Sequence, residues 1–148
     1  MARGHRGVMV RAGLVGAAVL GLSCLAGAQE LPPFRKGLWE LTRTVEGTGQ
    51  PKSTVTRKAC TSPTEDMRRG REQSAKAGCQ LAETHRAGNT YRYTATCVLP
   101  NGKITSNQIL TTQADSGYTV KIDSSGTVGG QTVSTKEELI AKRLGDCP

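Results

Sequence analysis

The chain has 148 residues, a formal net charge of +8 and only 3% aromatic residues. Its length suits one domain rather than two. Its 22% of charged residues is near the average for globular domains, which excludes wholesale disorder. No motif in the sequence indicates a particular reaction.

Residues 1–28 have the pattern of a secretory signal peptide. Arg3, Arg6 and Arg11 form a positive start, and residues 12–25 are uncharged and small or apolar. Ala-Gly-Ala at 26–28 matches the small-x-small motif that precedes the cleavage site. We therefore expect an exported protein with a single mature domain of residues 29–148. We expect no transmembrane span, because the apolar run is shorter than the ~20 residues that cross a bilayer.

Cleavage after Ala28 also changes the charge of the protein. Three arginines and no acidic residue leave, so the mature domain has 17 Lys+Arg and 12 Asp+Glu, a net charge of +5. This balance is modest for a nucleic-acid-binding protein, and we expect no nucleic acid as a partner. An alternative is a lipoprotein cut before Cys24 and acylated there. Gly21 stands where lipoprotein signals usually carry a branched apolar residue, so cleavage after Ala28 fits better.

The mature domain retains four cysteines, namely Cys60, Cys79, Cys97 and Cys147. An even number of cysteines in an exported chain predicts two disulfides. Sequence permits three pairings, of which a meander favours Cys60 with Cys79 across a helix and Cys97 with Cys147 across strands. The spacings lack the close pairs of structural zinc sites, and no C-x-x-C redox motif is present. We expect neither a metal nor another cofactor.

Most of the predicted elements are strands. Alternating or β-branched stretches predict strands at 37–45, 53–60, 79–87, 90–99, 103–113, 118–123 and 131–140. The last stretch also suits a helix, because Lys136, Glu137 and Glu138 are compatible with one.

One helix is expected near residues 63–77. Ser62-Pro63-Thr64-Glu65 matches a capping box with proline at the first helical position, and Gly78 is a typical C-terminal stop. The predicted fold is therefore mainly β. It is an antiparallel meander forming a half-barrel or open sandwich of six to seven strands, with one short peripheral helix.

Three stretches of the sequence resemble a known family. They are KGLWE at 36–40, CTSP at 60–63 and RLGDC at 143–147, and in this order they resemble the bacterial family called domain of unknown function 3617. Lys36 departs from the proline that we associate with its position. The resemblance implies a small exported protein of Gram-negative bacteria, located in the periplasm and with paired cysteines, and it supplies no catalytic residue.

Four aromatic residues are candidates for lining a pocket for a small apolar ligand: Trp39, Tyr91, Tyr93 and Tyr118. Core packing explains the same residues, since an aromatic-poor domain needs them inside. His85 is the only histidine after residue 28. No motif supplies it with a nucleophile, and we expect no enzymatic activity.

The predicted helix is basic, with Arg68, Arg69 and Arg71 as candidates for docking an acidic partner. The alternative is a solvated face on which acidic neighbours balance these charges, namely Glu65, Asp66 and Glu72. The leading hypothesis is an exported β domain that binds a small apolar ligand or a cell-envelope component. The second hypothesis is a protein–protein interaction module that docks through the basic helix.

Overall fold

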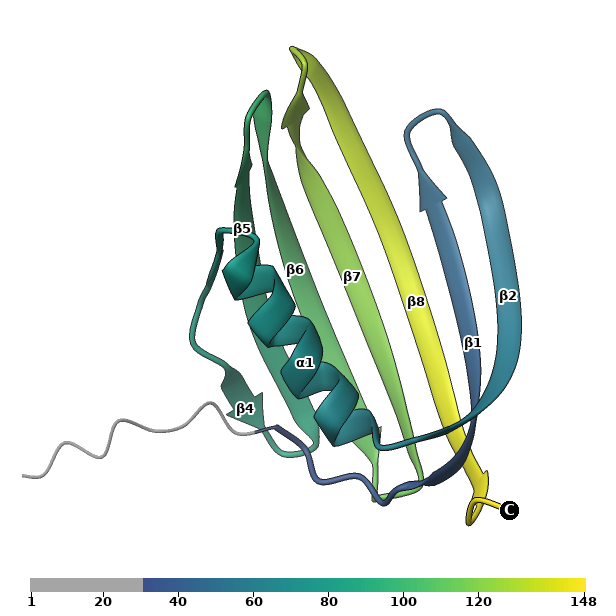
Figure 1. Cartoon of the computed structure of the whole chain (residues 1–148). Coiled ribbons are helices and arrows are strands. Elements are labelled where there is room, and N and C mark those ends of the chain that lie inside the picture. The colour runs from purple at the N-terminus through teal and green to yellow at the C-terminus, as the bar shows by residue number, and fades with distance from the viewer. Residues whose placement is uncertain (1–30) are drawn as a thin grey trace, which may run out of the picture.

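A computed structural model describes residues 31–148, so the predicted signal peptide and Cys24 lie outside the described residues. Figure 1 shows one curved sheet with a helix across its concave face. The strands are β1 (Gly37–Gly47), β2 (Gln50–Thr61), β3 (Cys79–Leu81), β4 (His85–Ala87), β5 (Thr90–Leu99), β6 (Gly102–Gln113), β7 (Gly117–Val128) and β8 (Gln131–Gly145). The helix is α1 (Pro63–Lys76).

The described strands form one open antiparallel sheet. Their order is β2-β1-β8-β7-β6-β5-β3, and β4 also pairs with β5. The predicted class is confirmed, with eight strands in place of six to seven. The ambiguous stretch at 131–140 is part of a strand, β8. This last strand lies between β1 and β7 in the sheet. The β1–β2 hairpin is therefore hydrogen-bonded to the rest of the sheet through β8.

The predicted strand at 79–87 is divided into β3 and β4. Leu81 pairs with Ala95 and His85 pairs with Arg92. Three residues, 82–84, therefore stand opposite two residues of β5, 93–94. An extra residue on one strand interrupts the ladder as a β-bulge does, and this edge of the sheet breaks into two short strands.

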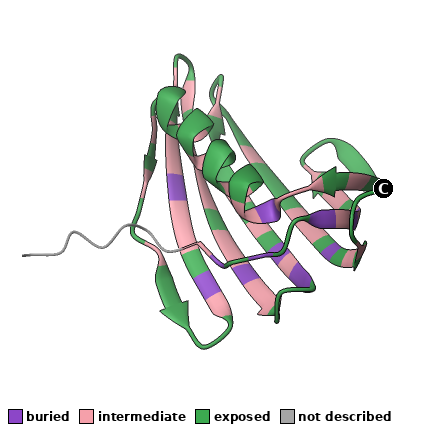
Figure 2. Cartoon of the chain, turned by 60° about the horizontal axis from the view of Figure 1, so that its bottom comes forward, coloured by how far each residue is buried: buried purple, intermediate pink, exposed green. Residues whose placement is uncertain are grey.

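The buried side chains lie at one end of the sheet, under α1 and the segment that precedes β1. Figure 2 shows these buried positions, whereas the outer surface of α1 is exposed. The cluster consists of Phe34, Trp39, Leu41, Tyr91, Leu110, Tyr118, Val120 and Ala141. These positions fall together because antiparallel pairing sets the first residues of one strand beside the last residues of the next.

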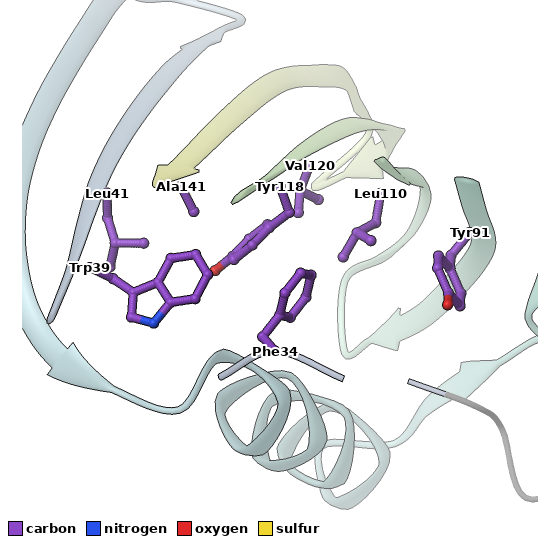
Figure 3. Close-up of a cluster of buried hydrophobic side chains, with 8 residues drawn as sticks. All are labelled: Phe34, Trp39, Leu41, Tyr91, Leu110, Tyr118, Val120 and Ala141. Carbon is purple, nitrogen blue, oxygen red and sulfur yellow. The ribbon is translucent and has the colours of Figure 1, made fainter. Parts of the chain in front are cut away.

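Phe34 connects the segment before β1 to the core. Its ring lies 4.6 Å from that of Tyr118 and 5.9 Å from that of Trp39, measured between centroids (Figure 3). Its backbone N–H donates to Thr64 Oγ1 at 2.9 Å, which joins the segment to α1. The Trp39 Nε1–H donates to the Arg35 carbonyl at 3.1 Å. The lead-in to the first strand is therefore part of the core.

The structure has two disulfides, but the predicted pairing is wrong. Cys60 bonds Cys147, and Cys79 bonds Cys97. Leu38 pairs with both Cys60 and Gly145, so the insertion of β8 beside β1 brings the C-terminus to the end of β2. Cys79 and Cys97 are direct partners in the β3–β5 ladder.

Helix α1 begins and ends where the sequence predicts, but its predicted cap is absent. Ser62 makes no side-chain hydrogen bond to the helix, so the capping box is wrong. The neighbouring Thr61 hydroxyl donates to the Asp66 side-chain carboxylate and leaves the backbone N–H groups of the first turn uncapped by a side chain. Gly78 follows the helix with φ +84°, a conformation that glycine adopts without strain.

Candidate ligand-binding groove

A groove of about 790 Å³ runs along the concave face between α1 and the β1–β2 hairpin. Its walls come from alternate residues of adjacent strands, which point to the same face of the sheet. Val55, Arg43, Leu139 and Val120 form one row across β2, β1, β8 and β7, each in register with the next. The surface is mostly apolar and is completed by Leu41, Val45, Ile122 and Met67.

The groove stays open because α1 brings few large side chains to it. Met67 is partly buried against the core cluster, and Pro63 is the one fully buried residue of the helix. Gly70 lines the groove, and a Cβ added there would meet no atom within 4 Å. Val55, on the opposite wall, is 61% exposed. Apolar side chains of the sheet thus face solvent across this groove instead of packing against the helix.

An ion pair is built into the middle of the wall. Arg43 Nε and Nη2 donate to the two carboxylate oxygens of Glu137, each at 2.7 Å. Paired donors of this kind hold both groups in a defined geometry. The hydrogen bonds to Glu137 raise the pKa of Arg43, and the charge of this arginine is compensated within the wall.

The end of the groove nearest the core carries Tyr118, Arg57 and Asp66. Burial raises the pKa of Tyr118 to about 12, with the Asp66 carboxylate adding to the effect and Arg57 opposing it. The phenol is therefore neutral at physiological pH. Asp66 forms an ion pair with Arg69 and accepts a hydrogen bond from Thr61. Arg57 has no ion-pair partner among residues 31–148.

The structure separates the four aromatic candidates. Trp39 is fully buried and Tyr91 is 3% exposed, and both belong to the core. Tyr93 and Tyr118 line the groove. Tyr93 also borders a smaller hollow on the other side of α1, where the guanidinium of Arg71 lies 4.7 Å from its ring centroid.

Sequence reasoning missed the residues of the β1–β2 wall, chiefly Arg43, Val55 and Arg57. Their alternation was visible, because Val55 and Arg57 are two residues apart and must share a face. What the sequence did not indicate is a contact between parts of the chain that are far apart. Nothing local indicates that this face of the hairpin would turn toward a helix.

The three candidate docking arginines lie on α1 among acidic partners. Arg68 pairs with Glu65 at 2.6 Å and also with Glu72, and Arg69 pairs with Asp66. Arg71 donates to Thr84 Oγ1 at 3.0 Å. Arg68 and Arg69 are thus paired with acidic neighbours and Arg71 is bound to a hydroxyl, so the geometry gives no preference for an acidic partner, and docking through this helix stays a prediction.

His85 lies exposed on the short strand β4, in register with Arg92. No hydrogen bond joins its side chain to a hydroxyl or carboxylate of residues 31–148. Over the same residues, no three His, Cys, Asp or Glu side chains come together as metal ligands. The helix of this part of the chain is too short and too polar to cross a membrane.

The fold and the groove define a class of small disulfide-bonded proteins built on one open antiparallel sheet, with a helix across its concave face. The chain belongs to the family described as Protein of unknown function (DUF3617), whose family model matches residues 34–147. The resemblance drawn from the three sequence stretches is thereby confirmed. No curated protein and no solved structure matches the chain.

Proposed function

We propose that this protein is an exported binding protein whose groove takes a small, largely apolar molecule without transforming it. The observation that carries the proposal is the row of exposed and half-buried apolar side chains along a groove of about 790 Å³. Small-molecule sites typically have volumes of about 300–1,000 Å³ and mostly apolar linings. Covering such surface contributes roughly 25 cal/mol per Å², which gives an apolar ligand a reason to bind.

Export is supported by two independent features. The first is the signal-peptide pattern of residues 1–28. The second is the pair of disulfides, which persist in oxidising compartments and indicate a non-cytoplasmic protein. We place the protein in the periplasm on these grounds. The ligand would then be a molecule or cell-envelope component that is poorly soluble in the periplasm.

The test is binding of N-phenyl-1-naphthylamine, a neutral apolar dye whose fluorescence rises in apolar surroundings. The full chain would be expressed in a Gram-negative host and purified from its periplasm. Val55→Asp places an unpaired charge on the groove wall at a position that is 61% exposed, so the fold should persist. Because burying that charge is costly, we expect dye binding to weaken about tenfold or more.

Val98→Asp is the matched control. Val98 is 64% exposed and lies on β5 one residue beyond Cys97, so it points to the opposite face from Tyr93 and the groove. This variant should bind the dye as the parent protein does. Absence of dye binding by the parent, or equal losses in the two variants, would contradict a ligand-binding groove.

A further inference from the structure

The charges that line the groove do not cancel. Its charged residues are Arg43, Arg57 and Asp66. Glu137 compensates Arg43, and Arg69 compensates Asp66. Within residues 31–148 Arg57 alone of the three has no ion pair, so the groove carries one uncompensated positive charge at its core-facing end.

We propose that the groove binds a single-chain amphiphile with one anionic head group, and that Arg57 binds that head group while the hydrocarbon lies against the apolar side chains of the groove. This inference rests on the proposed function and names the class of ligand. It follows from charge complementarity. A groove with one unpaired cation and a mostly apolar lining matches a molecule with one anion and an apolar body.

The strand register places Arg57 and the apolar side chains of the groove on one continuous wall. Arg57 is the direct partner of Leu41, and Val55 is the partner of Arg43 in the next row. Arg57 and Val55 are two residues apart on β2 and point to the same face. A head group at Arg57 therefore lets its chain run past Leu41 toward Leu139 and Val120, which also line the groove, beside the Arg43–Glu137 ion pair.

The neighbours of Arg57 add no competing anion. The phenol of Tyr118 is neutral at physiological pH, because burial raises its pKa to about 12. The Asp66 carboxylate is held by Arg69 and Thr61. A cationic head group would meet Arg57 with unfavourable charge, and a neutral one would leave its charge unmatched.

The experiment compares dodecanoate with dodecanol, which share a chain and differ in the head group. Each displaces N-phenyl-1-naphthylamine from the full chain at pH 8, below the concentration at which micelles form. We expect dodecanoate to displace the dye at about one-fifth of the dodecanol concentration, the size of effect given by an exposed ion pair. Added salt should reduce this preference, because it screens the charge of Arg57.

Arg57→Gln should remove the preference for dodecanoate and leave displacement by dodecanol unchanged. Lys58→Gln is the matched control. Lys58 is the next residue of β2, its side chain is 61% exposed and pairs with Glu40, and it points to the other face of the sheet. Both variants lose one positive charge, but the second should keep the preference for dodecanoate.

Each outcome has one meaning. Equal displacement by the two compounds, or equal effects of the two variants, would overturn the role of Arg57. The groove itself would still be supported if the parent protein binds the dye and Val55→Asp weakens that binding. A third outcome concerns membranes. If the parent protein shows no preference for dodecanoate but sediments with vesicles of phosphatidylglycerol, and Arg57→Gln weakens that sedimentation, the ligand is a membrane surface and not a single-chain amphiphile. If the parent protein does not bind the dye at all, the proposed function itself is contradicted.

Discussion

Tyr118 joins the core to the groove. Its ring contacts those of Phe34 and Trp39 inside the cluster, with centroid separations of 4.6 and 5.7 Å, and the same side chain lines the groove. Figure 3 shows Tyr118 directed toward Trp39. A ring in this position must stay uncharged, because ionisation would place a phenolate among apolar side chains.

The first prediction concerns the pH dependence of stability. The pKa of Tyr118 is about 12 in the folded protein and about 10 in an unfolded chain. The folded state therefore holds the proton more tightly, and this stabilisation is fully present below pH 10. We expect roughly 2–3 kcal/mol of the free energy of unfolding to be lost between about pH 10 and pH 12, measured by urea unfolding across that range.

Tyr118→Phe is the control, because it keeps the ring and removes the ionisable hydroxyl. The loss between pH 10 and 12 should be smaller in this variant. Some loss should remain, since burial also raises the pKa of Tyr93. An unchanged pH dependence in Tyr118→Phe would show that Tyr118 does not carry the effect.

The two tyrosines of β5 show which part of their environment could be predicted from the sequence. Alternation placed Tyr91 and Tyr93 on one face of their strand, and both lie on the concave face. It could not separate Tyr91, which is 3% exposed, from the groove-lining Tyr93. Their difference depends on what covers each position. The guanidinium of Arg86 lies 5.1 Å from the ring centroid of Tyr91, whereas Tyr93 faces the groove.

At the scale of elements, the three stretches that carry the family resemblance meet at one corner of the sheet. The guanidinium of Arg143 donates to the Lys36 carbonyl at 3.1 and 3.3 Å. A Cβ at Gly37 would collide with the Gly145 carbonyl, so this close approach requires glycine. The Cys60–Cys147 disulfide closes the same corner and joins the C-terminal end of the chain to β2.

The second prediction follows from the unequal loops that the disulfides close. They span 87 and 18 residues. In the chain-entropy account, the longer loop contributes roughly 4.5 kcal/mol and the shorter roughly 3 kcal/mol. Replacing Cys60 and Cys147 by serine should therefore lower the free energy of unfolding more than replacing Cys79 and Cys97 does.

Urea unfolding of the two double-serine variants measures this difference. Each variant is the control for the other, because each loses one disulfide and gains two hydroxyls. A larger loss for the Cys79 and Cys97 variant would contradict the loop-length account. Mass spectrometry of peptides from the parent protein would check the pairing itself.

At the scale of the whole molecule, stability depends on the compartment in which the protein folds. The aromatic-poor core occupies one end of the sheet, and within residues 31–148 no helix or strand packs against the other end. A domain with so small a core benefits from disulfides, and disulfides need an oxidising compartment. A reducing environment would remove part of what holds this fold together.

The third prediction is the intact mass of the protein purified from the periplasm of a Gram-negative host. We expect the mass of residues 29–148 less four hydrogens, because the signal peptide is removed and both disulfides have formed. Denaturing mass spectrometry measures this value, and the same sample after reduction should gain four mass units. An acylated chain beginning at Cys24 would support the lipoprotein alternative, and free thiols would contradict the disulfides.

The features that depend on neighbouring residues could be predicted from the sequence. Period-two alternation located most strands, and Pro63 and Gly78 marked the ends of α1. The number of disulfides and the family followed from the cysteine count and three short stretches. The signals for the strands and the helix ends lie within or beside these elements, and the cysteine count needs no knowledge of which cysteines pair.

The cysteine pairing and the groove depend on contacts between distant parts of the chain. The insertion of β8 beside β1 brings residue 147 to residue 60, and the path of α1 leaves the β1–β2 wall uncovered. Alternation assigns a side chain to one face of a strand. The alternating pattern is the same whether that face is covered by a helix, by another strand or by solvent. Only the assembled sheet therefore decides that Val55 and Arg57 line a groove while Trp39 and Tyr91 lie in the core.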